Sequence, residues 1–410
     1  MHLEKLNVFL QFSDAKIPVG QFVLDGKEVL FKYSASYLNA GWNISPLKLS
    51  FDQKIQMGPM TPFRGLFGVF ADSLPDAWGQ LIMKRQLSRR GIAIETLNSL
   101  EYLAYVGNNG LGALSYIPSF TESTKPKSRE VDLDILSSNA QAILQGASTE
   151  IVDHIFTAAG SPGGARPKMY VGFNPVDDSL ISGTAALPSG YEHWIIKFGT
   201  TNDATDNANI EMAYHRMAIA AGIEMNECRL FSGKSGRKYF GTRRFDRVGN
   251  SRLHMISAAG LFHDDYERSQ LDYGMLMQEG SRLVGSIEVA SQVLRLAAFN
   301  IFAHNRDDHS KNFAFLMDGS GTWKFAPAFD LTFSSSSQGQ HSTTCAGNGV
   351  NPGTKELYEL IQHFSIRNGK EIVKQVKFAV GLWAKFARQA KVSRESMNLI
   401  GKVIQLLKTR

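Results

Sequence analysis

Two short stretches near the beginning of the chain, residues 6–12 and 28–33, alternate apolar with polar positions. This two-residue period predicts β-strands with one buried face. Residues 76–90 follow instead the three- and four-residue apolar spacing of an amphipathic helix, which Gly91 would end. Together these elements predict a first domain of the α+β class over residues 1–120.

A polar stretch interrupts the pattern after this domain. Residues 118–132 contain two prolines and no apolar period, which is typical of a linker. Strand-like runs and a helix follow before the sequence becomes increasingly helical; they are residues 168–173, 193–198 and 238–245 (strands) and 210–221 (helix). Strands followed by helices are the order of a two-lobed nucleotide-binding enzyme. We therefore divide the chain into an N-terminal domain (1–120), a linker and lead-in (121–145) and a second domain (146–410).

The composition is that of an ordinary globular protein, with 43% hydrophobic and 20% charged residues in a chain of 410. No uncharged apolar run reaches eighteen residues, and Glu4, Lys5 and Asp14 interrupt the first apolar positions. We therefore expect a cytoplasmic protein with no membrane span and no secretion signal. The two cysteines, Cys228 and Cys345, lack Cys-x-x-Cys spacing, which excludes a disulfide framework and a thiolate-rich metal site.

The net charge of +6 is concentrated at the end of the chain. Residues 370–410 contain ten Lys or Arg residues against Glu371 and Glu395. A basic helical surface attracts nucleic acid or an acidic partner at long range. A solvated helix face is the alternative interpretation.

One polar cluster, residues 305–312, lies between an apolar helix-like run and a strand-like run. Arg306, Asp307 and Asn312 have the Arg-Asp-x-x-x-x-Asn spacing of protein kinases, in which the Asp accepts the substrate hydroxyl proton and the Asn binds magnesium. The spacing selects Asp307 rather than Asp308 as the base. A polar turn without catalytic function is the alternative. The sequence lacks Gly-x-x-x-x-Gly-Lys-Ser/Thr, His-Glu-x-x-His and Gly-x-Ser-x-Gly.

Further positions fit a kinase site. Asp330 follows an apolar run and could supply a second magnesium ligand, or cap a helix. Lys197 lies in an apolar strand, from which a kinase lysine reaches the ATP phosphates, and Glu211 at the start of the next helix would be its partner. Glu211 could equally be a charge favoured by the helix dipole. Gly163 and Gly164 could let backbone N–H groups approach phosphate, although such glycines are common in turns.

Seven stretches together resemble the HipA family of serine/threonine kinases, the toxins of bacterial type II toxin–antitoxin pairs, over nearly the whole chain. They are residues 70–79 (FADSLPDAWG), 110–114, 161–168, 194–198, 244–247, 307–312 and 326–330. The resemblance implies a protein-kinase-like, two-lobed C-terminal domain preceded by a smaller α+β N-terminal domain. It also implies ATP and Mg²⁺ as cofactors.

The resemblance further implies a role for each matching residue. Asp307 would be the catalytic base, and Lys311 would stabilise charge on the transferring phosphoryl group. The implied nucleotide contacts are Lys197 and His309 at the phosphates, Gly163 and Gly164 in the phosphate loop, Arg243 and Phe245 at the adenine hinge, and Asp246 near the ribose. Asn312 and Asp330 would bind Mg²⁺, and Ser161 would be the autophosphorylated serine. Arg243 stands where some members have an acidic residue, and the loop at 161–168 differs from the Gln-Glu-Lys type of some relatives.

The resemblance thus predicts an ATP- and Mg²⁺-dependent serine/threonine protein kinase that inhibits growth as a toxin. Its partners would be a helix-turn-helix antitoxin of the HipB type, operator DNA reached through that complex, and a protein substrate in translation such as an aminoacyl-tRNA synthetase. Residues 341–347 would belong to the substrate-docking segment, or form a polar surface loop. Two other functions stay open: a catalytically silent kinase-like protein in a repressor complex, and a small-molecule phosphotransferase.

Overall fold

The N-terminal part of the chain is built on a five-stranded antiparallel sheet. We analysed a computed structural model, which describes residues 2–39, 41–120, 130–146, 166–183, 186–200, 203–336 and 339–408. The strand order is β4-β3-β2-β1-β5. The strands are β1 (Lys5–Leu10), β2 (Ile17–Asp25), β3 (Glu28–Tyr33), β4 (Gln56–Met57) and β5 (Leu114–Ile117), and the helices are α1 (Ala35–Leu38), α2 (Gly68–Ala71), α3 (Ala77–Arg89) and α4 (Ser99–Val106). The strand predicted at 28–33 and the helix predicted at 76–90 are present as β3 and α3.

A second five-stranded sheet, ordered β7-β6-β8-β10-β9, begins the C-terminal part. Its strands are β6 (Lys168–Phe173), β7 (Leu180–Ser182), β8 (Glu192–Lys197), β9 (Cys228–Ser232) and β10 (Lys238–Arg243). Helix α5 (Leu133–Leu144) buries Leu136 and Ile143 in one hydrophobic cluster with Val171 and Trp194 of this sheet. The part of the expected linker and lead-in that the structure describes therefore includes a helix packed on the second sheet.

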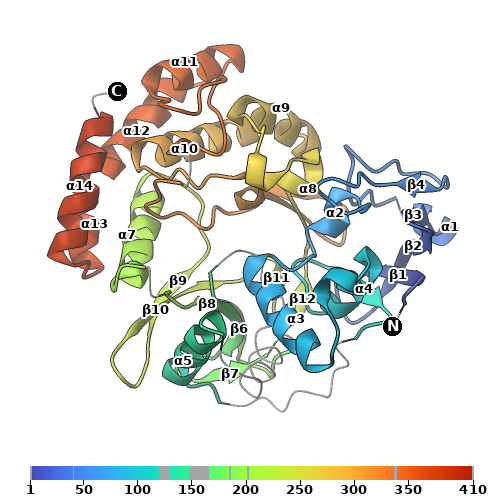
Figure 1. The fold of residues 1–410 in the computed structure, drawn as a ribbon. Helices are drawn as coiled ribbons and strands as arrows, with labels where there is room; N and C mark the ends of the chain where they lie inside the picture. The colour runs from blue at the N-terminus through green and yellow to red at the C-terminus, as the bar shows by residue number, and fades with distance from the viewer. Residues whose placement is uncertain are drawn as a thin grey trace.

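Helices dominate the remainder of the chain. Helix α7 (Asn207–Ala220) follows β8 and lies next to β9 and β10 (Figure 1), and β13, β14 and β15 form a separate three-stranded sheet. The elements are β11 (Arg247–Val248), β12 (Ser251–Arg252), β13 (His254–Ser257), β14 (Ala314–Met317), β15 (Trp323–Phe325), α8 (Ala258–Phe262), α9 (Tyr273–Val284), α10 (Glu288–Phe302), α11 (Thr354–His363), α12 (Gly369–Gly381), α13 (Trp383–Gln389), α14 (Arg394–Lys408) and the 3₁₀ turns η1 (Ile94–Thr96), η2 (Tyr266–Arg268) and η3 (Ser310–Asn312). None of the described helices is long and apolar enough to cross a membrane.

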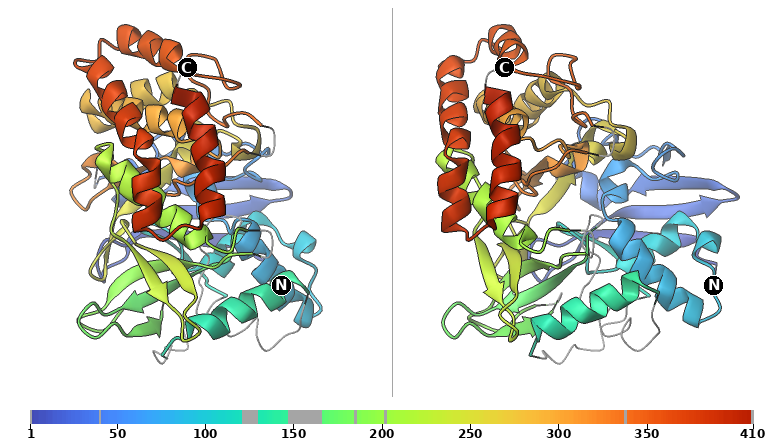
Figure 2. Two further views of the ribbon diagram at one scale, coloured as in Figure 1. Left: turned by 90° about the vertical axis from the view of Figure 1, so that its left-hand side faces the viewer. Right: turned by 60° about the vertical axis from the view of Figure 1, so that its left-hand side comes forward.

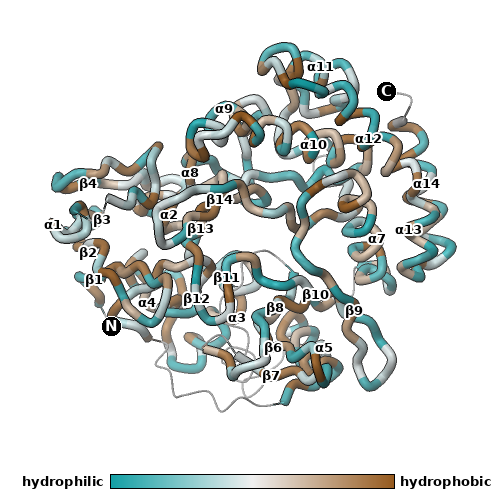
Figure 3. Tube along the Cα trace, turned by 180° about the vertical axis from the view of Figure 1, so that it is seen from behind, coloured by the Kyte–Doolittle hydropathy of each residue, from teal (hydrophilic) through white to brown (hydrophobic). Residues whose placement is uncertain are grey.

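The basic end of the chain forms helices α12–α14, on the opposite side of the molecule from the N-terminal sheet (Figures 1 and 2). Hydrophilic and hydrophobic residues alternate along α14 (Figure 3). The helix buries Ile400, Ile404 and Leu407, while most of its other described side chains are at least partly exposed. Contact between this basic surface and DNA stays a prediction.

The N-terminal sheet and the helical part share one hydrophobic core. A single cluster of buried residues includes Phe70 of α2, Leu261 of α8 and Val293 of α10. Helices α2 and α8 meet at Gly68 and Gly260, where a Cβ atom on Gly68 would lie 2.2 Å from the Gly260 carbonyl oxygen. The missing side chains let the two backbones touch, and this contact brings residues 72–78 to the C-terminal part of the molecule.

Candidate active site

The loop before β14 contains the predicted base. Helix α10 and strand β14 hold its two ends, and both are largely buried. The Asp307 side chain is 60% exposed, whereas that of Asp308 is 0% exposed. The Asn312 Nδ2 donates to the Asp307 carbonyl oxygen at 2.7 Å, which closes the loop. The structure therefore turns the carboxylate selected by the kinase spacing outward and its neighbour inward.

Buried Asp308 ties this loop to the segment after Asp330. Its carboxylate accepts hydrogen bonds from the Tyr273 hydroxyl (2.7 Å) and the Ser342 backbone N–H (2.8 Å), and it lies 2.9 Å from His341 Nδ1. The Thr343 hydroxyl donates to the Asp308 carbonyl oxygen. The described segment 341–344 is thus anchored to the loop that contains Asp307 and Asp308 and is not an independent surface loop.

A lysine between two carboxylates forms the centre of the site. Lys197 Nζ, at the end of β8, lies 2.6 Å from Glu211 Oε2 on α7 and also contacts Asp330 Oδ1. Burial alone would lower the pKa of Lys197, but the charges of Asp330 and Glu211 raise it above its ordinary value. Burial opposes ionisation of Asp330 as well, and Lys197 and Lys168 nevertheless hold its pKa well below the usual range. Three segments that are far apart in sequence therefore form one charged cluster.

Asp330 has a left-handed backbone, with φ at 58°, which is uncommon outside glycine. Its carboxylate and the Asn312 amide oxygen are the oxygen ligands that Mg²⁺ prefers, and Mg²⁺ commonly takes only one or two protein ligands beside phosphates and water. Among the described residues, no group of three or more His, Cys, Asp or Glu side chains could hold a metal ion alone. The residues therefore fit a nucleotide-linked Mg²⁺ rather than an all-protein metal site.

Lys168 is a second lysine at this site that the sequence analysis did not single out. It is buried at the start of β6 and is the cross-strand partner of Lys197. Burial lowers the pKa of Lys168, against the attraction of Asp330. All six residues of β6 are buried, and burial of a lysine in such a strand costs free energy unless its charge is paired with an anion. A lysine at the start of an apolar strand is therefore the sequence signal that could have identified Lys168.

Lys311 and His309 lie at the edge of the loop. The Lys311 ammonium pairs with Asp76, the residue before α3 in the N-terminal domain, and lies 4.4 Å from the centre of the Tyr266 ring. Burial would lower the pKa of Lys311, whereas Asp76 and Asp72 raise it. His309 Nε2 is 3.9 Å from Asp307 Oδ1, and its ring is close enough to Asp330 to influence the pKa of that carboxyl. The sequence analysis assigned Asp76 only to a family motif.

The two residues predicted at the adenine hinge differ in position: Phe245 lies next to the Asp330 segment, whereas the Arg243 side chain lies at the surface. Phe245 packs against Phe329, the neighbour of Asp330, with ring centres 5.2 Å apart. The Arg243 side chain reaches Glu192 (3.4 Å) and Glu227 (3.8 Å) at the surface. Its backbone N–H and carbonyl oxygen bond to Glu227 and Asn226. An adenine contact by either residue stays a prediction.

Asp246 is buried, at 2% exposure. Its carboxylate accepts hydrogen bonds from Arg244, from Arg247 and, at 2.8 Å, from the Gly112 backbone N–H of the N-terminal domain. Despite burial, the two arginines keep the pKa of Asp246 well below its usual range. A carboxylate with all these partners has no exposed oxygen for a ribose hydroxyl, so the structure weighs against the predicted ribose contact.

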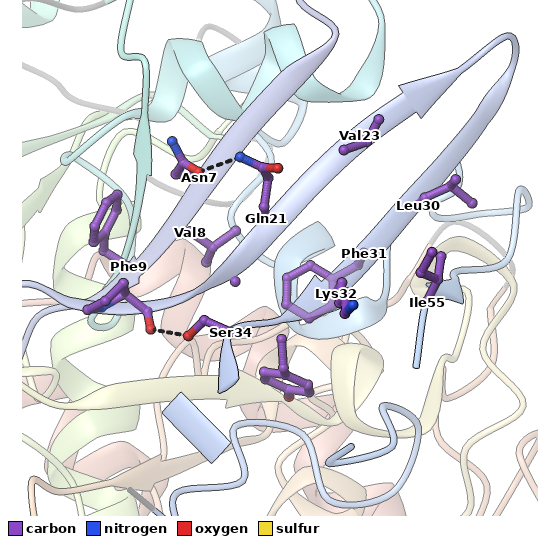
Figure 4. A pocket seen from close by; sticks show the side chains of 13 residues that line it. Asn7, Val8, Phe9, Gln21, Val23, Leu30, Phe31, Lys32, Ser34 and Ile55 are labelled. Carbon is purple, nitrogen blue, oxygen red and sulfur yellow. Dashed lines mark hydrogen bonds between the residues drawn. The ribbon is translucent and has the colours of Figure 1, made fainter. Parts of the chain in front are cut away.

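Two hollows differ in their chemistry. The one in Figure 4 lies on the N-terminal sheet, and its thirteen lining residues, Val8, Leu30 and Ile55 among them, contain no Asp, Glu, His or Cys. The other contains Lys197 and Glu211, with Arg166 and Thr200 at its wall. Lys197 and Glu211 of the charged cluster therefore line the second hollow and not the first. The predicted phosphate-loop residues Gly163 and Gly164 and the predicted autophosphorylation site Ser161 lie outside the described residues.

Two family models match the chain. The model of the HipA-like C-terminal domain matches residues 160–407, and that of the HipA N-terminal domain matches residues 7–117. The chain belongs to the HipA family. The resemblance seen in the sequence motifs is confirmed.

Two individual proteins also match most of the chain. The sequence is 26% identical over 358 residues to Putative kinase Y4mE of Sinorhizobium fredii, covering 81% of this chain and 77% of that protein. The fold is similar to that of HipA from Shewanella oneidensis MR-1 in a complex with HipB and operator DNA, with a TM-score of 0.68 and 15% identity over 98% of this chain and 96% of that chain. The expected α+β class, with a kinase-like C-terminal domain behind a smaller N-terminal one, is confirmed.

Proposed function

We propose that this HipA-family protein is an ATP- and Mg²⁺-dependent serine/threonine protein kinase that acts as a growth-inhibiting toxin. The observation that carries the proposal is the contact of Lys197 with both Glu211 and Asp330. Phosphoryl transfer needs positioning and charge neutralisation more than covalent chemistry, and this cluster supplies fixed charges of both signs. His309, which is 3.9 Å from Asp307, links the cluster to Asp307 because its ring influences the pKa of Asp330.

Each residue of the cluster has a defined task in such a reaction. Lys197, held by Glu211, would bind the α- and β-phosphates, and Asn312 and Asp330 would hold Mg²⁺, which would supply charge neutralisation at the phosphates. Asp307 accepts the proton of the substrate hydroxyl. Lys311 offsets charge that develops on the transferring group, because a preorganised cation needs no reorganisation during the reaction. His309 orients toward the phosphates from its position beside Asp307.

The comparisons suggest the partners. The Shewanella oneidensis HipA structure contains HipB and operator DNA, and we propose a helix-turn-helix antitoxin of the HipB type and operator DNA through that complex for this chain. Basic helices α12–α14 would face the DNA. The substrate we propose is a translation component such as an aminoacyl-tRNA synthetase, with autophosphorylation on Ser161 as a means of inactivation.

Transfer of label from γ-labelled ATP, with Mg²⁺, tests the central proposal. Wild-type protein should label itself and a protein in a bacterial lysate, whereas Asp307→Ala should label neither because the base is lost. Asp14→Ala, which removes an exposed carboxylate outside the site, serves as the control and should keep activity.

The remaining outcomes would overturn the proposal. No transfer by a wild-type preparation that binds ATP would favour the catalytically silent repressor. Label that appears only on small hydroxyl compounds would favour a small-molecule phosphotransferase. Activity that survives in Asp307→Ala would remove the role given to Asp307.

A further inference from the structure

Asp76 occupies an unusual position for an N-cap residue. It precedes α3 with extended backbone, yet its side chain makes no capping hydrogen bond to that helix. An N-cap Asp normally stabilises its helix by about 1 kcal/mol through such a bond. The carboxylate instead reaches Lys311, 235 positions further along the chain. The local gain of a cap is thus replaced by a contact with the other domain.

The segment that carries Asp76 is fixed on both sides of the site. Asp72 accepts hydrogen bonds from the Ser257 backbone N–H (2.6 Å) and hydroxyl (2.7 Å), where β13 leads into α8. On the other side, the Trp78 indole N–H donates to the carbonyl oxygen of Lys168 on β6 at 3.2 Å. Residues 72–78 therefore touch both the sheet and the helical part of the kinase-like domain. A carboxylate held in this way has little freedom to follow a moving lysine.

The Lys311 ammonium lies between fixed groups. Asp76 pairs with it, and the Tyr266 ring lies beneath it at 4.4 Å. Tyr266 also packs against His309, which is beside Asp307. The side chains of Lys311 and Asp76 are 20% and 13% exposed, so the pair lies at the margin of the site rather than in the core. An ammonium has three donors, and the bond to Asp76 uses one of them.

We propose that Asp76 is a positioning residue of the kinase reaction, supplied by the N-terminal domain, which holds Lys311 against Tyr266 so that its remaining donors meet the phosphates. The inference rests on the proposed function. A lysine side chain has about 2 kcal/mol of rotamer entropy to lose when it is ordered. Asp76 and Tyr266 order it before the nucleotide arrives, so the reaction gains a preorganised cation.

Other roles for the contact between Asp76 and Lys311 predict a different change in the rate of phosphoryl transfer. If Asp76 sequestered Lys311 from the phosphates, loss of its charge would release the lysine and increase the rate. If the pair only joined the two domains, loss of the charge would leave the rate of the folded protein unchanged. The direction of the change in rate therefore distinguishes positioning from inhibition and from a structural role.

The experiment compares Asp76→Asn, Asp76→Glu and Lys311→Met with the wild type, using label transfer to measure kcat and the KM for ATP. Glu95→Gln is the matched control, because Glu95 forms an exposed ion pair with Lys84 (3.3 Å) in the same domain. Asn can occupy an N-cap position, so Asp76→Asn should fold. We expect kcat to fall by about tenfold to a hundredfold in Asp76→Asn, as for other residues that orient a reacting group. Asp76→Glu should recover part of the rate, and Glu95→Gln should match the wild type.

A double variant tests whether Asp76 acts through Lys311. In the Lys311→Met background, Asp76→Asn should cause no further loss, because the group that it positions is gone. A mass-spectrometric acylation footprint provides a readout that needs no turnover: Lys311 should become several-fold more reactive in Asp76→Asn, with Lys84 as the internal reference.

Three results would overturn the inference: a raised or unchanged kcat in folded Asp76→Asn, additive losses in the double variant, or an unchanged Lys311 footprint. These differ from failure of the proposed function, in which the wild type itself transfers no phosphate while it binds ATP.

Discussion

The N-terminal domain meets the kinase-like domain at two places where an aspartate lies beside a cation, and the two places differ in burial. At the first place, Asp246, Arg244 and Arg247 all belong to the kinase-like domain, their side chains are at most 4% exposed, and both arginines reach backbone oxygens of Gly110 and Gly112 in the N-terminal domain. At the site margin, Asp76 and Lys311 remain partly exposed. The carboxylate of Asp246 thus has its hydrogen bonds satisfied in a structural contact. The ammonium of Lys311, by contrast, keeps donors that are available for chemistry.

Burial explains this difference in physical terms. Two charges removed from water lose hydration that their attraction barely replaces, so a buried pair is retained only when its geometry is good and its other hydrogen bonds are satisfied. Asp246 meets that condition through two guanidinium groups and a backbone N–H. A pair at the margin loses less hydration and contributes less to stability. Changes at the first place should therefore affect folding, and changes at the second should affect the rate.

The largest expected effect is that of Asp246→Ala. Removal of the carboxylate leaves Arg244 and Arg247 buried beside each other, and breaking a buried pair in this way typically costs about 3–5 kcal/mol. We expect a large fall in the urea midpoint of unfolding. Asp76→Asn and Glu95→Gln, measured in parallel, should change stability by no more than about 1 kcal/mol. Equal shifts in the three variants would contradict the division between a structural and a functional contact.

A smaller loss is expected where α2 and α8 touch through their backbones at two glycines. Gly68→Ala places a Cβ atom 2.2 Å from the Gly260 carbonyl oxygen, so α2 and α8 must move apart. Overpacking of this kind typically costs about 1–3 kcal/mol. Because α2 leads into residues 72–78, the movement should also weaken the hold of Asp76 on Lys311 and lower kcat. Ala71→Gly, which removes a methyl group from the same helix, is the comparison. An unchanged midpoint and kcat in Gly68→Ala would show that the helices are not in close contact.

The sequence was informative where local pattern determines structure. The strands at 28–33 and 168–173 were predicted with the bounds that β3 and β6 have, because alternation or a buried run is visible without the fold. The Arg-Asp-x-x-x-x-Asn spacing selected Asp307, and the structure turns its side chain outward.

Other features depend on contacts between distant residues. The sequence places Asp76 only at the start of the helix predicted at 76–90, and the fold is needed to place it against Lys311. Asp246 matches a family motif near the expected ribose, yet its carboxylate is buried and accepts a hydrogen bond from the Gly112 backbone N–H of the other domain. The helix α5 begins directly after the polar stretch at 118–132 that composition marked as linker, within the expected lead-in to the second domain, and its apolar face covers the second sheet. Contacts between residues far apart in the sequence determine the role of each of these residues. Local sequence patterns do not reveal such contacts.

The smallest expected effect concerns acid. The Gly68 backbone N–H donates to His263 Nε2 at 3.0 Å, so the imidazole must be neutral to accept this bond between the domains. Burial, with help from the Lys48 charge, lowers the pKa of His263 from 6.5 to about 4. Between about pH 6.5 and pH 4 the unfolded chain therefore binds more protons than the folded one, and stability falls as the pH falls through this range. Above pH 6.5 this contribution is fully present.

His263→Asn isolates this contribution from those of the other histidines. Asn does not titrate, and it tolerates the left-handed backbone at this position, where φ is 59°. Between pH 7.5 and pH 5.5 the wild type should lose more stability than the variant, by less than about 1 kcal/mol because the ring is partly exposed. Urea midpoints at the two pH values measure the difference. Asp246, whose pKa lies far below this range, should contribute nothing to it, so acid should loosen the contact at Gly68 while the Asp246 network stays intact. Parallel losses in wild type and variant would show that His263 does not link the two domains through its neutral ring.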